Sequence, residues 1–448
     1  MDLRKLDLLK LSPPRILVSG FALIILIGGI LLSLPVSAAP GHEPISFLDA
    51  LFTATSATCV TGLVVADTGR DFSTFGQVVI MLLIQVGGLG FMTMATLVAL
   101  MLKKKISLRE RLILQEALNQ SSMEGIVRLI RKVLIYSLTI EAVAAVIFTI
   151  RWAFEYPLGK AMFLGMWHAV SMFNNAGFDL FGEYRSLTMY VNDPVVNVVA
   201  MCLIILGGIG FIVMSDLMDY RQKRKLSLHT KVVLSTSAFL IVLGALVIFI
   251  FEYSNAKTMG PLSFQGKVLS AFFQSVTPRT AGANTLDIAG LRQATQFFII
   301  ILMFIGASPG STGGGIKTTT FTTLVGGIIS MIRGKEDIVL FRNRLAKDRL
   351  LKALTITMIA LILVVFVSML LSTTEDHSFL MILFEVTSAF GTVGLSMGLT
   401  ANLTVFGKIM IMLMMFAGRL GPLTLAYALQ PNKEKELYRY PEGKIIIG

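Results

Sequence analysis

The chain has 448 residues, of which 54% are hydrophobic and only 15% are charged. A soluble domain of this composition would have too little polar surface to stay in water, so the composition predicts a membrane protein. The formal net charge of +12 does not indicate nucleic-acid binding, because the basic residues form short blocks between apolar stretches, as membrane proteins require. These blocks, which suit anionic lipid headgroups, are Lys103–Lys105, Arg128–Lys132, Arg221–Lys225 and Arg342–Lys352.

Eight segments have the length and apolar character of membrane spans, which need about 20 helical residues. In chain order the predicted spans are Ile16–Val36, Gly76–Leu102, Val133–Ile150, Val195–Ser215, Val232–Phe251, Phe297–Ser308 resuming at Thr318–Ile332, Ala353–Leu371, and a segment from about Leu403. Four shorter apolar segments lie between successive spans and are predicted to be re-entrant half-helices. They are Ile45–Ala57, Lys160–Phe173, Phe264–Thr277 and Phe379–Phe390.

The order of span, half-helix and span occurs four times and defines four predicted repeats. The repeats cover residues 16–102, 133–220, 229–332 and 353–429; residues 1–15 and 430–448 are the termini, and residues 103–132 and 333–352 are the longer connecting loops. Most lysines and arginines lie in the termini and in the loops between repeats. The positive-inside rule therefore places both termini in the cytoplasm, with the half-helices entering from outside.

A single glycine recurs at the same place after each half-helix, in the segments TCVTGL (58–63), FNNAGF (173–178), PRTAGA (278–283) and FGTVGL (390–395). Ten residues before the glycine stands an aromatic residue, which is Phe52, Trp167, Phe272 or Phe384, and six residues before it stands Ser56, Ser171, Val276 or Ser388. A packing or turn role explains one such glycine but not the shared offsets, which indicate internal repeats. Because the offsets run in the same direction, the repeats are parallel, unlike the inverted repeats of many secondary transporters.

A half-helix that stops at mid-membrane continues into extended backbone, which cannot face lipid and must line a cavity. Four such segments around one axis direct carbonyl oxygens to the centre, where they can replace the water shell of a monovalent cation. Glycine permits the required φ values, and the C-terminal ends of the half-helices add partial negative charge. The predicted filter consists of Cys59, Val60, Thr61 and Gly62; Asn174, Asn175, Ala176 and Gly177; Arg279, Thr280, Ala281 and Gly282; and Gly391, Thr392, Val393 and Gly394.

The predicted fold is an all-α polytopic membrane protein. Its four parallel span–pore-loop–span repeats provide eight transmembrane helices and four re-entrant half-helices around one pseudo-four-fold pore.

A second aligned motif follows each filter segment, at Val86–Gly90, Leu206–Gly210, Ile305–Gly310 and Ala417–Gly421. Close helix packing is the expected reason for the first two. The third continues into a stretch with five glycines and a proline within Gly306–Gly315, and no helix survives there, because glycine costs about 1 kcal/mol and proline about 3 kcal/mol. The sequence therefore predicts a flexible gating loop below the filter, formed by Gly310, Ser311, Thr312, Gly313, Gly314 and Gly315 and followed by Lys317.

Arg419 lies at membrane depth, in the position that Gly88 and Gly208 hold in the first two repeats. Charges within a membrane are usually functional. Arg419 is predicted to face the pore and to hold the gating loop shut; the alternative is a structural ion pair with a buried acid such as Glu385 or Glu141.

Other polar residues near the filter allow a structural reading. Arg279 is predicted to brace the filter by bonding carbonyl groups or a half-helix acid. Asp49 and Glu385 could supply negative charge near the outer pore, although a hydrogen-bonded brace is the more common role for such residues, and the same holds for His168.

The TVG of the fourth filter segment, Thr392–Gly394, resembles part of a potassium-channel filter, and four non-identical span–loop–span units resemble the Trk/Ktr/HKT superfamily of potassium transporters. Eight spans with a glycine-rich break in the sixth are similar to the Ktr membrane subunits. The resemblance covers about Arg15 to Leu429 and implies a potassium-conducting protein of the bacterial cell membrane with an intramembrane gate at Ser311–Gly315. Because the neighbours of the four glycines differ, we expect poorer rejection of sodium than in a symmetric potassium channel.

The resemblance also implies partners: a homodimer that sits on a cytosolic ring of regulatory subunits, which bind adenine nucleotides. Lys103–Lys132 and the tail Tyr438–Gly448 are the expected docking surfaces. The chain itself has no P-loop, no GxGxxG motif after a strand, no paired catalytic carboxylates and no His/Cys cluster, so neither a cofactor nor enzymatic activity is predicted. Potassium is the expected transported ligand, and it stays open whether sodium activates transport. The competing prediction is a sodium- or proton-coupled secondary transporter, for which Glu141 is the sole carboxylate near the centre of an ordinary span.

Overall fold

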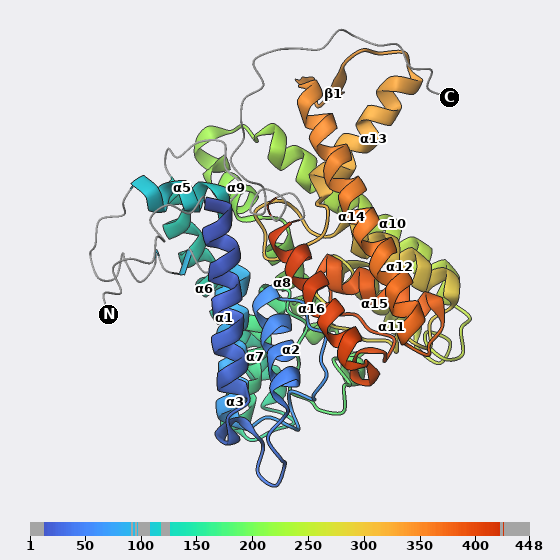
Figure 1. Ribbon diagram of the computed structural model, residues 1–448. Coiled ribbons are helices and arrows are strands. Elements are labelled where there is room, and N and C mark those ends of the chain that lie inside the picture. The colour runs from blue at the N-terminus through green and yellow to red at the C-terminus, as the bar shows by residue number, and fades with distance from the viewer. Residues whose placement is uncertain are drawn as a thin grey trace.

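The computed structural model describes residues 13–90, 93–94, 96, 108–117, 126–421 and 424. In this part of the chain, four helices are long and apolar enough to cross a membrane by themselves. They are α1 (Pro13–Leu32), α6 (Ile126–Trp152), α10 (Leu228–Glu252) and α14 (Lys347–Thr374). Each contains most of the first span predicted for one of the four repeats. Figure 1 shows α1 and α14 on opposite sides of the molecule.

Four shorter helices lie within two residues of the predicted half-helices at either end: α2 (Phe47–Cys59), α7 (Leu158–Phe173), α11 (Phe264–Val276) and α15 (Phe379–Gly391). Serine side chains begin two of them, since Ser46 accepts a hydrogen bond from the N–H of Asp49 and Ser263 accepts one from Gly266. These caps satisfy N–H groups that a helix start leaves free. The C-terminal turns of all four helices are buried, so each helix ends inside the protein.

The second helix of each predicted repeat is shorter than expected or is followed by a break: α3 (Thr74–Leu89), α8 (Pro194–Gly208), α12 (Gln293–Ile305) and α16 (Val405–Leu420). Gly90, with a φ of 83°, ends the helix inside the predicted span 76–102. The prediction of one straight span over 195–215 is wrong, because the chain breaks at Gly210 and resumes as α9 (Phe211–Lys223) at an angle of 98°. Glycine adopts such φ values without strain and therefore ends the helix. The predicted break after α12 is present as a loop before α13 (Thr318–Ile332).

The predicted loop 333–352 contains a short hairpin that the sequence analysis did not predict. Strand β1 (Ile338–Leu340) pairs antiparallel with β2 (Asn343–Leu345). Phe341 and Arg342 form the turn with φ values of 46° and 63°, and two-residue hairpin turns of this kind need positive φ at both positions. Figure 1 shows the hairpin at the far end of α13 and α14, which extend beyond the other helices. The remaining elements are α5 (Leu108–Ala117), η3 (Pro35–Ser37), η4 (Thr188–Tyr190) and η5 (Thr400–Asn402).

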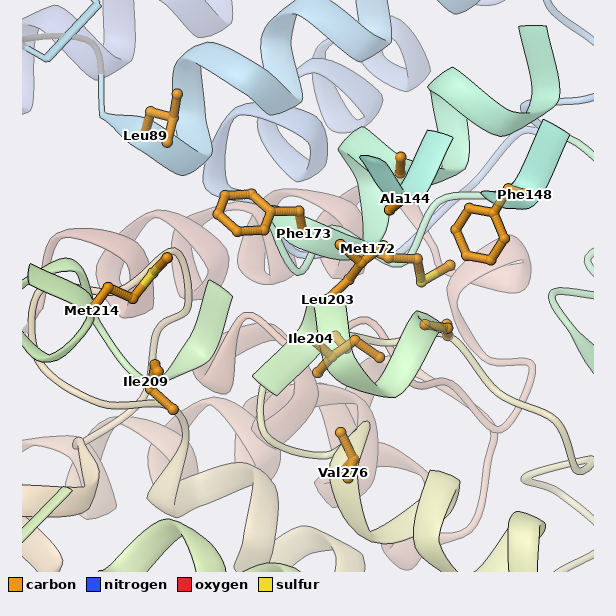
Figure 2. Packing of buried hydrophobic residues seen from close by; sticks show 14 of the residues in the cluster. Leu89, Ala144, Phe148, Met172, Phe173, Leu203, Ile204, Ile209, Met214 and Val276 are labelled. Carbon is orange, nitrogen blue, oxygen red and sulfur yellow. The ribbon is translucent and has the colours of Figure 1, made fainter. Parts of the chain in front are cut away.

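The second helix of each predicted repeat packs against the half-helix of the next repeat. Helix α3 contacts α7, α8 contacts α11, α12 contacts α15, and α16 returns to contact α2. One hydrophobic cluster connects the first three repeats, with Leu89 from α3, Phe173 from α7, Ile204 from α8 and Val276 from α11 (Figure 2). The last contact joins α16 to α2, the half-helix of the first predicted repeat, and closes the half-helices into a ring, which frames the candidate site.

Candidate ion pathway

The segment after each half-helix repeats the same backbone conformation. Two residues before each filter glycine a non-glycine residue has a positive φ: Val60 (59°), Asn175 (60°), Thr280 (87°) and Thr392 (49°). The glycines themselves also have positive φ: Gly62 (89°), Gly177 (68°), Gly282 (75°) and Gly394 (90°). Positive φ is costly for a β-branched residue, so the surrounding structure must hold these segments in place.

The four segments contact one another in a closed ring. At each contact, a side-chain carbon built on a filter glycine would lie closer than 3.0 Å to the carbonyl oxygen of the residue that precedes the next filter glycine. In ring order these contacts join Gly62 with Ala176, Gly177 with Ala281, Gly282 with Val393, and Gly394 with Thr61. The structure therefore brings the predicted filter residues of all four repeats together, and only glycine fits at these four positions.

Serine hydroxyls at the ends of the half-helices hold the filter segments. Ser56 Oγ accepts a hydrogen bond from the N–H of Gly62 at 3.0 Å, and Ser388 Oγ accepts one from Gly394 at the same distance. Ser171 donates instead to the carbonyl of the residue after its filter glycine, at 2.7 Å. The serine that recurs in the sequence thus fixes the backbone next to the filter glycine.

The third repeat departs from the sequence offsets by one residue. Val276 stands at the serine position, but Thr277 supplies the hydroxyl, which donates to the carbonyl of Ala283 at 2.5 Å. Similarly, Phe272 stands at the aromatic position and is 40% exposed, whereas the neighbouring Phe273 is fully buried. In the third repeat, the fixed offsets therefore did not identify Thr277, which supplies the hydroxyl, or Phe273, which is the buried aromatic residue.

The first residues of the four segments differ in their contacts. Asn174 Nδ2 donates to Gln85 on α3 at 2.9 Å and to Glu141 on α6 at 3.0 Å. Arg279 donates to the carbonyl and the hydroxyl of Ser237 on α10, at 3.3 and 2.8 Å. Arg279 therefore contacts α10, and within the described part of the chain no hydrogen bond joins it to a half-helix acid. The other two first residues, Cys59 and Gly391, are buried.

A cavity of about 390 Å³ lies on the glycine side of the ring. All four filter glycines line it, together with the carboxylates of Asp67, Asp179 and Asp287. Like charges in a cleft raise the local concentration of counter-ions. The cavity therefore favours cations at the mouth of the ring.

The loop between α12 and α13, residues 306–317, lies against the ring on the side of the threonines. A side-chain carbon built on Gly313 or Gly314 would lie closer than 3.0 Å to the hydroxyl of Thr280 or Thr392, respectively. The predicted gating residues thus touch the filter directly, and the two glycines allow this close approach.

Backbone hydrogen bonds tie the same loop to the break between α8 and α9. Ser308 N–H donates to the carbonyl of Gly208 at 3.0 Å, and Phe211 N–H donates to that of Gly310 at 2.8 Å. The broken helix of the second repeat therefore supplies the partners that the loop backbone needs.

Arg419, in the fourth predicted repeat, joins the loop to the first predicted repeat. Its guanidinium donates to the carbonyl of Thr312 in the loop and to the carbonyls of Gly87 and Gly88 at the end of α3, the last at 3.0 Å. Among the described residues it forms no ion pair with Glu385 or Glu141, the two acids that the alternative prediction names. The arginine connects three polypeptide segments beneath the ring.

Lys317, the last residue of the loop, also holds it in place. It has φ 83° and ψ 140°, close to the values of Gly210 (94°, 143°) and Gly421 (83°, 136°). Lys317 is therefore the structural counterpart of these glycines, and the loop is an insertion before it. Its Nζ donates to the carbonyls of Gly313 and Gly314, the latter at 3.1 Å.

A family comparison matches this arrangement of helices, ring and loop. Residues 29–436 match the family model of TrkH, described as a cation transport protein. The chain belongs to the TrkH family of cation transport proteins. It is accordingly a helical, multi-pass membrane protein and not an enzyme.

Known TrkH-family relatives cover nearly the whole chain. The Ktr system potassium uptake protein B of Bacillus subtilis (strain 168) is 46% identical over 439 residues, covering 98% of this chain and 97% of the relative. The potassium/sodium uptake protein NtpJ of Enterococcus hirae is 40% identical over 445 residues, covering 98% of each. The crystal structure of the potassium transporter TrkH from Vibrio parahaemolyticus has a TM-score of 0.70 at 19% identity and covers 96% of this chain and 87% of that one, which shows a shared fold.

Two buried polar residues in the half-helices of this TrkH-family chain brace the segments beside the cavity. Glu385 accepts hydrogen bonds from the hydroxyls of Ser396, at 2.9 Å, and Thr400. His168 Nε2 accepts from the N–H of Leu180 at 3.4 Å. Both contacts agree with the predicted bracing role.

A polar residue that was not predicted from the sequence recurs at one position in the second helices. The fourth residue of α3, α8, α12 and α16 is Gln77, Asn197, Gln296 and Lys408. The three amides donate to carbonyls of the loop that follows their own filter segment, at distances down to 2.7 Å. Lys408 differs, because it forms an ion pair with Asp49 at 2.6 Å and so links the last repeat to the first. The sequence signal that could have revealed this position is a single polar residue at the same place in each apolar segment.

One carboxylate beside the cavity titrates near neutral pH. Burial, together with the charge of nearby Asp67, raises the pKa of Asp179 to about 7, although its carboxylate accepts a hydrogen bond from the N–H of Phe181. Asp67 accepts from the N–H groups of Gly69 and Tyr184, at 2.9 and 3.1 Å. The charge of the cavity wall therefore changes around pH 7.

Proposed function

We infer that this chain is the potassium-conducting subunit of a bacterial potassium uptake system. The observation that carries the proposal is the closed ring of four carbonyl–glycine contacts with the same backbone conformation in every segment. Carbonyl oxygens arranged around one axis can replace the hydration shell of potassium. The names of the relatives, which include potassium uptake proteins, support potassium as the ion.

The ring belongs, in this proposal, to four parallel span–half-helix–span repeats around one pseudo-four-fold pore. The contact of each second helix with the next half-helix, and of α16 with α2, supports that arrangement. The cavity with Asp67, Asp179 and Asp287 is the outer mouth, where carboxylates gather cations.

The loop 306–317 is the gate, held in a closed position by Arg419 and Lys317. Their cationic groups donate to carbonyls of Thr312, Gly313 and Gly314 directly beneath the ring. The buried hydroxyls of Thr61, Thr312 and Thr392 form no hydrogen bond with described residues and can line the path of the ion. Opening then requires the exchange of these side-chain bonds, the loss of the backbone bonds to Gly208 and Phe211, and a shift of a glycine-rich backbone.

Sodium should be rejected less strictly than in a symmetric channel, because the segments around the four glycines differ in sequence. Position −2 from the glycine is Val60, Asn175, Thr280 or Thr392, and Asn175 forms a hydrogen bond with Thr280 at 3.2 Å. The name of one relative, a potassium/sodium uptake protein, supports this expectation. A potassium-to-sodium permeability ratio as high as that of a symmetric channel would contradict it.

The proposed assembly is a homodimer in the bacterial cell membrane with both termini in the cytoplasm, bound to a cytosolic ring that binds nucleotides. The name "Ktr system" of one relative supports a complex with further subunits. The expected docking surfaces lie largely outside the described residues, since these include only 108–117 and 126–132 of the first loop and none of the tail 438–448. Deletion of Tyr438–Gly448 should weaken the assembly, and an unaltered complex on size exclusion would contradict this.

Rubidium uptake into proteoliposomes that contain the purified chain tests the proposed function. Uptake is driven by an opposing potassium gradient, with sodium and choline as competitors. We expect uptake that excess potassium blocks, that choline does not affect and that sodium inhibits weakly. Uptake that requires a sodium or proton gradient would instead support a coupled carrier.

A further inference from the structure

A buried network of three side chains stands behind the second filter segment. Glu141 on α6 accepts hydrogen bonds from Gln85 Nε2, at 3.2 and 3.1 Å to its two oxygens, and from Asn174 Nδ2 at 3.0 Å. Asn174 also donates to the side-chain oxygen of Gln85 at 2.9 Å. Because Asn174 is the first residue of the filter segment, this network links the carboxylate directly to the filter.

Glu141 lies on the face of α6 that turns toward the protein interior. Its exposed fraction is 6%, and Ala144 and Phe148 follow on the same face and join the cluster in Figure 2. Val143 and Val146 point away and are more than half exposed, as expected of a lipid-facing side. The carboxylate is thus directed at the half-helix and the filter segment, away from lipid.

Glu141 has no cationic partner among the described residues, where no ion pair with it occurs. The side-chain nitrogens that contact it are amide groups, which donate to a carboxylate without neutralising it. A buried charge without a counter-ion is costly. A cation held in the adjacent filter would supply the missing positive charge.

The corresponding positions of the other segments lack such a carboxylate. Arg279 contacts Ser237 on α10, and Cys59 and Gly391 carry no long polar side chain. The ring is therefore backed by a carboxyl group at its second segment and by a guanidinium group at its third.

We propose that Glu141 is a positioning residue that holds Asn174 at the filter and whose carboxylate has the transported cation as its counter-ion. This inference rests on the proposed function, and it assigns to Glu141 the control of cation affinity. A purely structural carboxyl group, by contrast, would affect only the stability of the protein.

Glu141→Gln separates these two roles, because glutamine has the shape of a protonated glutamic acid and lacks the charge. The measurement is the half-saturating potassium concentration that competes with rubidium uptake into proteoliposomes. We expect Glu141→Gln to raise it several-fold to about tenfold, the order of effect that one unit charge exerts over about 12 Å at an effective dielectric constant of about 20. Glu141→Asp keeps the charge and should restore most of the affinity.

Glu252→Gln is the matched control. Glu252 is also fully buried and accepts hydrogen bonds from Thr258, Thr295, Asn255 and the N–H of Arg292, but it lies at the end of α10 and contacts no filter residue. The variant Glu252→Gln should have a lower melting temperature and an unchanged half-saturating potassium concentration. A second readout without transport is the rise in melting temperature that potassium causes in detergent, which should be smaller in Glu141→Gln.

Wild-type affinity and wild-type thermal stabilisation in Glu141→Gln would overturn the inference, while active wild-type protein would leave the proposed function standing. Equal affinity losses in Glu141→Gln and Glu252→Gln would also overturn it, since they would reflect a general loss of structure. Absence of rubidium uptake in the wild type would instead contradict the proposed function itself.

Discussion

The filter ring and the loop beneath it are held by different kinds of interaction. In the ring, glycines meet carbonyl oxygens of the next segment, and Ser56 and Ser388 bond the backbone from behind. The side chains of Arg419 and Lys317 hold the loop at the neighbouring carbonyls of Thr312, Gly313 and Gly314, in addition to its backbone contacts. A ring fixed by close backbone contact cannot move without losing its geometry, whereas side-chain hydrogen bonds can be exchanged for water. In the proposed function, a rigid ring is thus paired with a releasable loop.

The largest expected effect is at the ring. Gly282→Asp places a side chain against the carbonyl of Val393 at a φ of 75°, so uptake of rubidium should fall at least about a hundredfold, the order produced by about 3 kcal/mol of lost ion stabilisation. Gly41→Asp is the matched control, because Gly41 also has a positive φ of 84° but no atom within 4 Å of a built side-chain carbon. Substantial uptake by Gly282→Asp would show that the ring does not conduct.

The next effect is at the loop and has the opposite sign. Arg419→Ala removes the bonds to Thr312, Gly87 and Gly88, so the closed loop should loosen and rubidium uptake should rise several-fold, given about 1.5–3 kcal/mol for each hydrogen bond to a charged group, partly replaced by water. Rubidium uptake by Arg419→Lys should lie between that of the wild type and that of Arg419→Ala. Unchanged uptake with a loss of folded protein on size exclusion would indicate a structural role.

Lys317 gives a smaller effect and separates strain from bonding. Lys317→Met and Lys317→Gly both remove the bonds to the loop carbonyls, so both should raise uptake, by about two- to threefold for one charge-assisted contact partly replaced by water. Lys317→Gly also relieves a positive φ that costs about 1–3 kcal/mol in a non-glycine residue, so it should melt at a higher temperature than Lys317→Met. Equal melting temperatures would show that this backbone conformation is not strained.

The smallest expected effect is at the outer cavity. The pKa of Asp179 is raised to about 7, so the carboxyl is neutral below this pH and negatively charged above it. The charged form attracts cations, and rubidium uptake at low rubidium concentration should therefore rise about twofold as the outside pH increases through about 7. Asp179→Asn should abolish this rise. A pH profile that Asp179→Asn leaves intact would contradict the assignment of this titration to Asp179.

Much of this arrangement could be predicted from the sequence, because its signals are local. The half-helices follow from the length of apolar segments, and the filter glycines follow from their fixed spacing. The loop after α12 follows from a composition that no helix tolerates.

Other features depend on contacts that spacing does not reveal. In the third repeat Thr277 supplies the hydroxyl from the position after Val276, and only its hydrogen bond to Ala283 reveals this. Motif alignment placed Gly310 beside Gly210, whereas the backbone angles assign that role to Lys317, which follows an inserted loop. The partners of Arg419 and Glu141 come from other repeats or other helices, so only the folded chain could identify them.

Anomalous diffraction from crystals of the chain grown with rubidium or thallium tests the central claim most directly. We expect anomalous density on the axis of the ring, within coordination distance of the carbonyl oxygens of Thr61, Ala176, Ala281 and Val393. Density that avoids the ring, or ions bound only at carboxylates of the cavity, would show that the ring is not the ion-binding site.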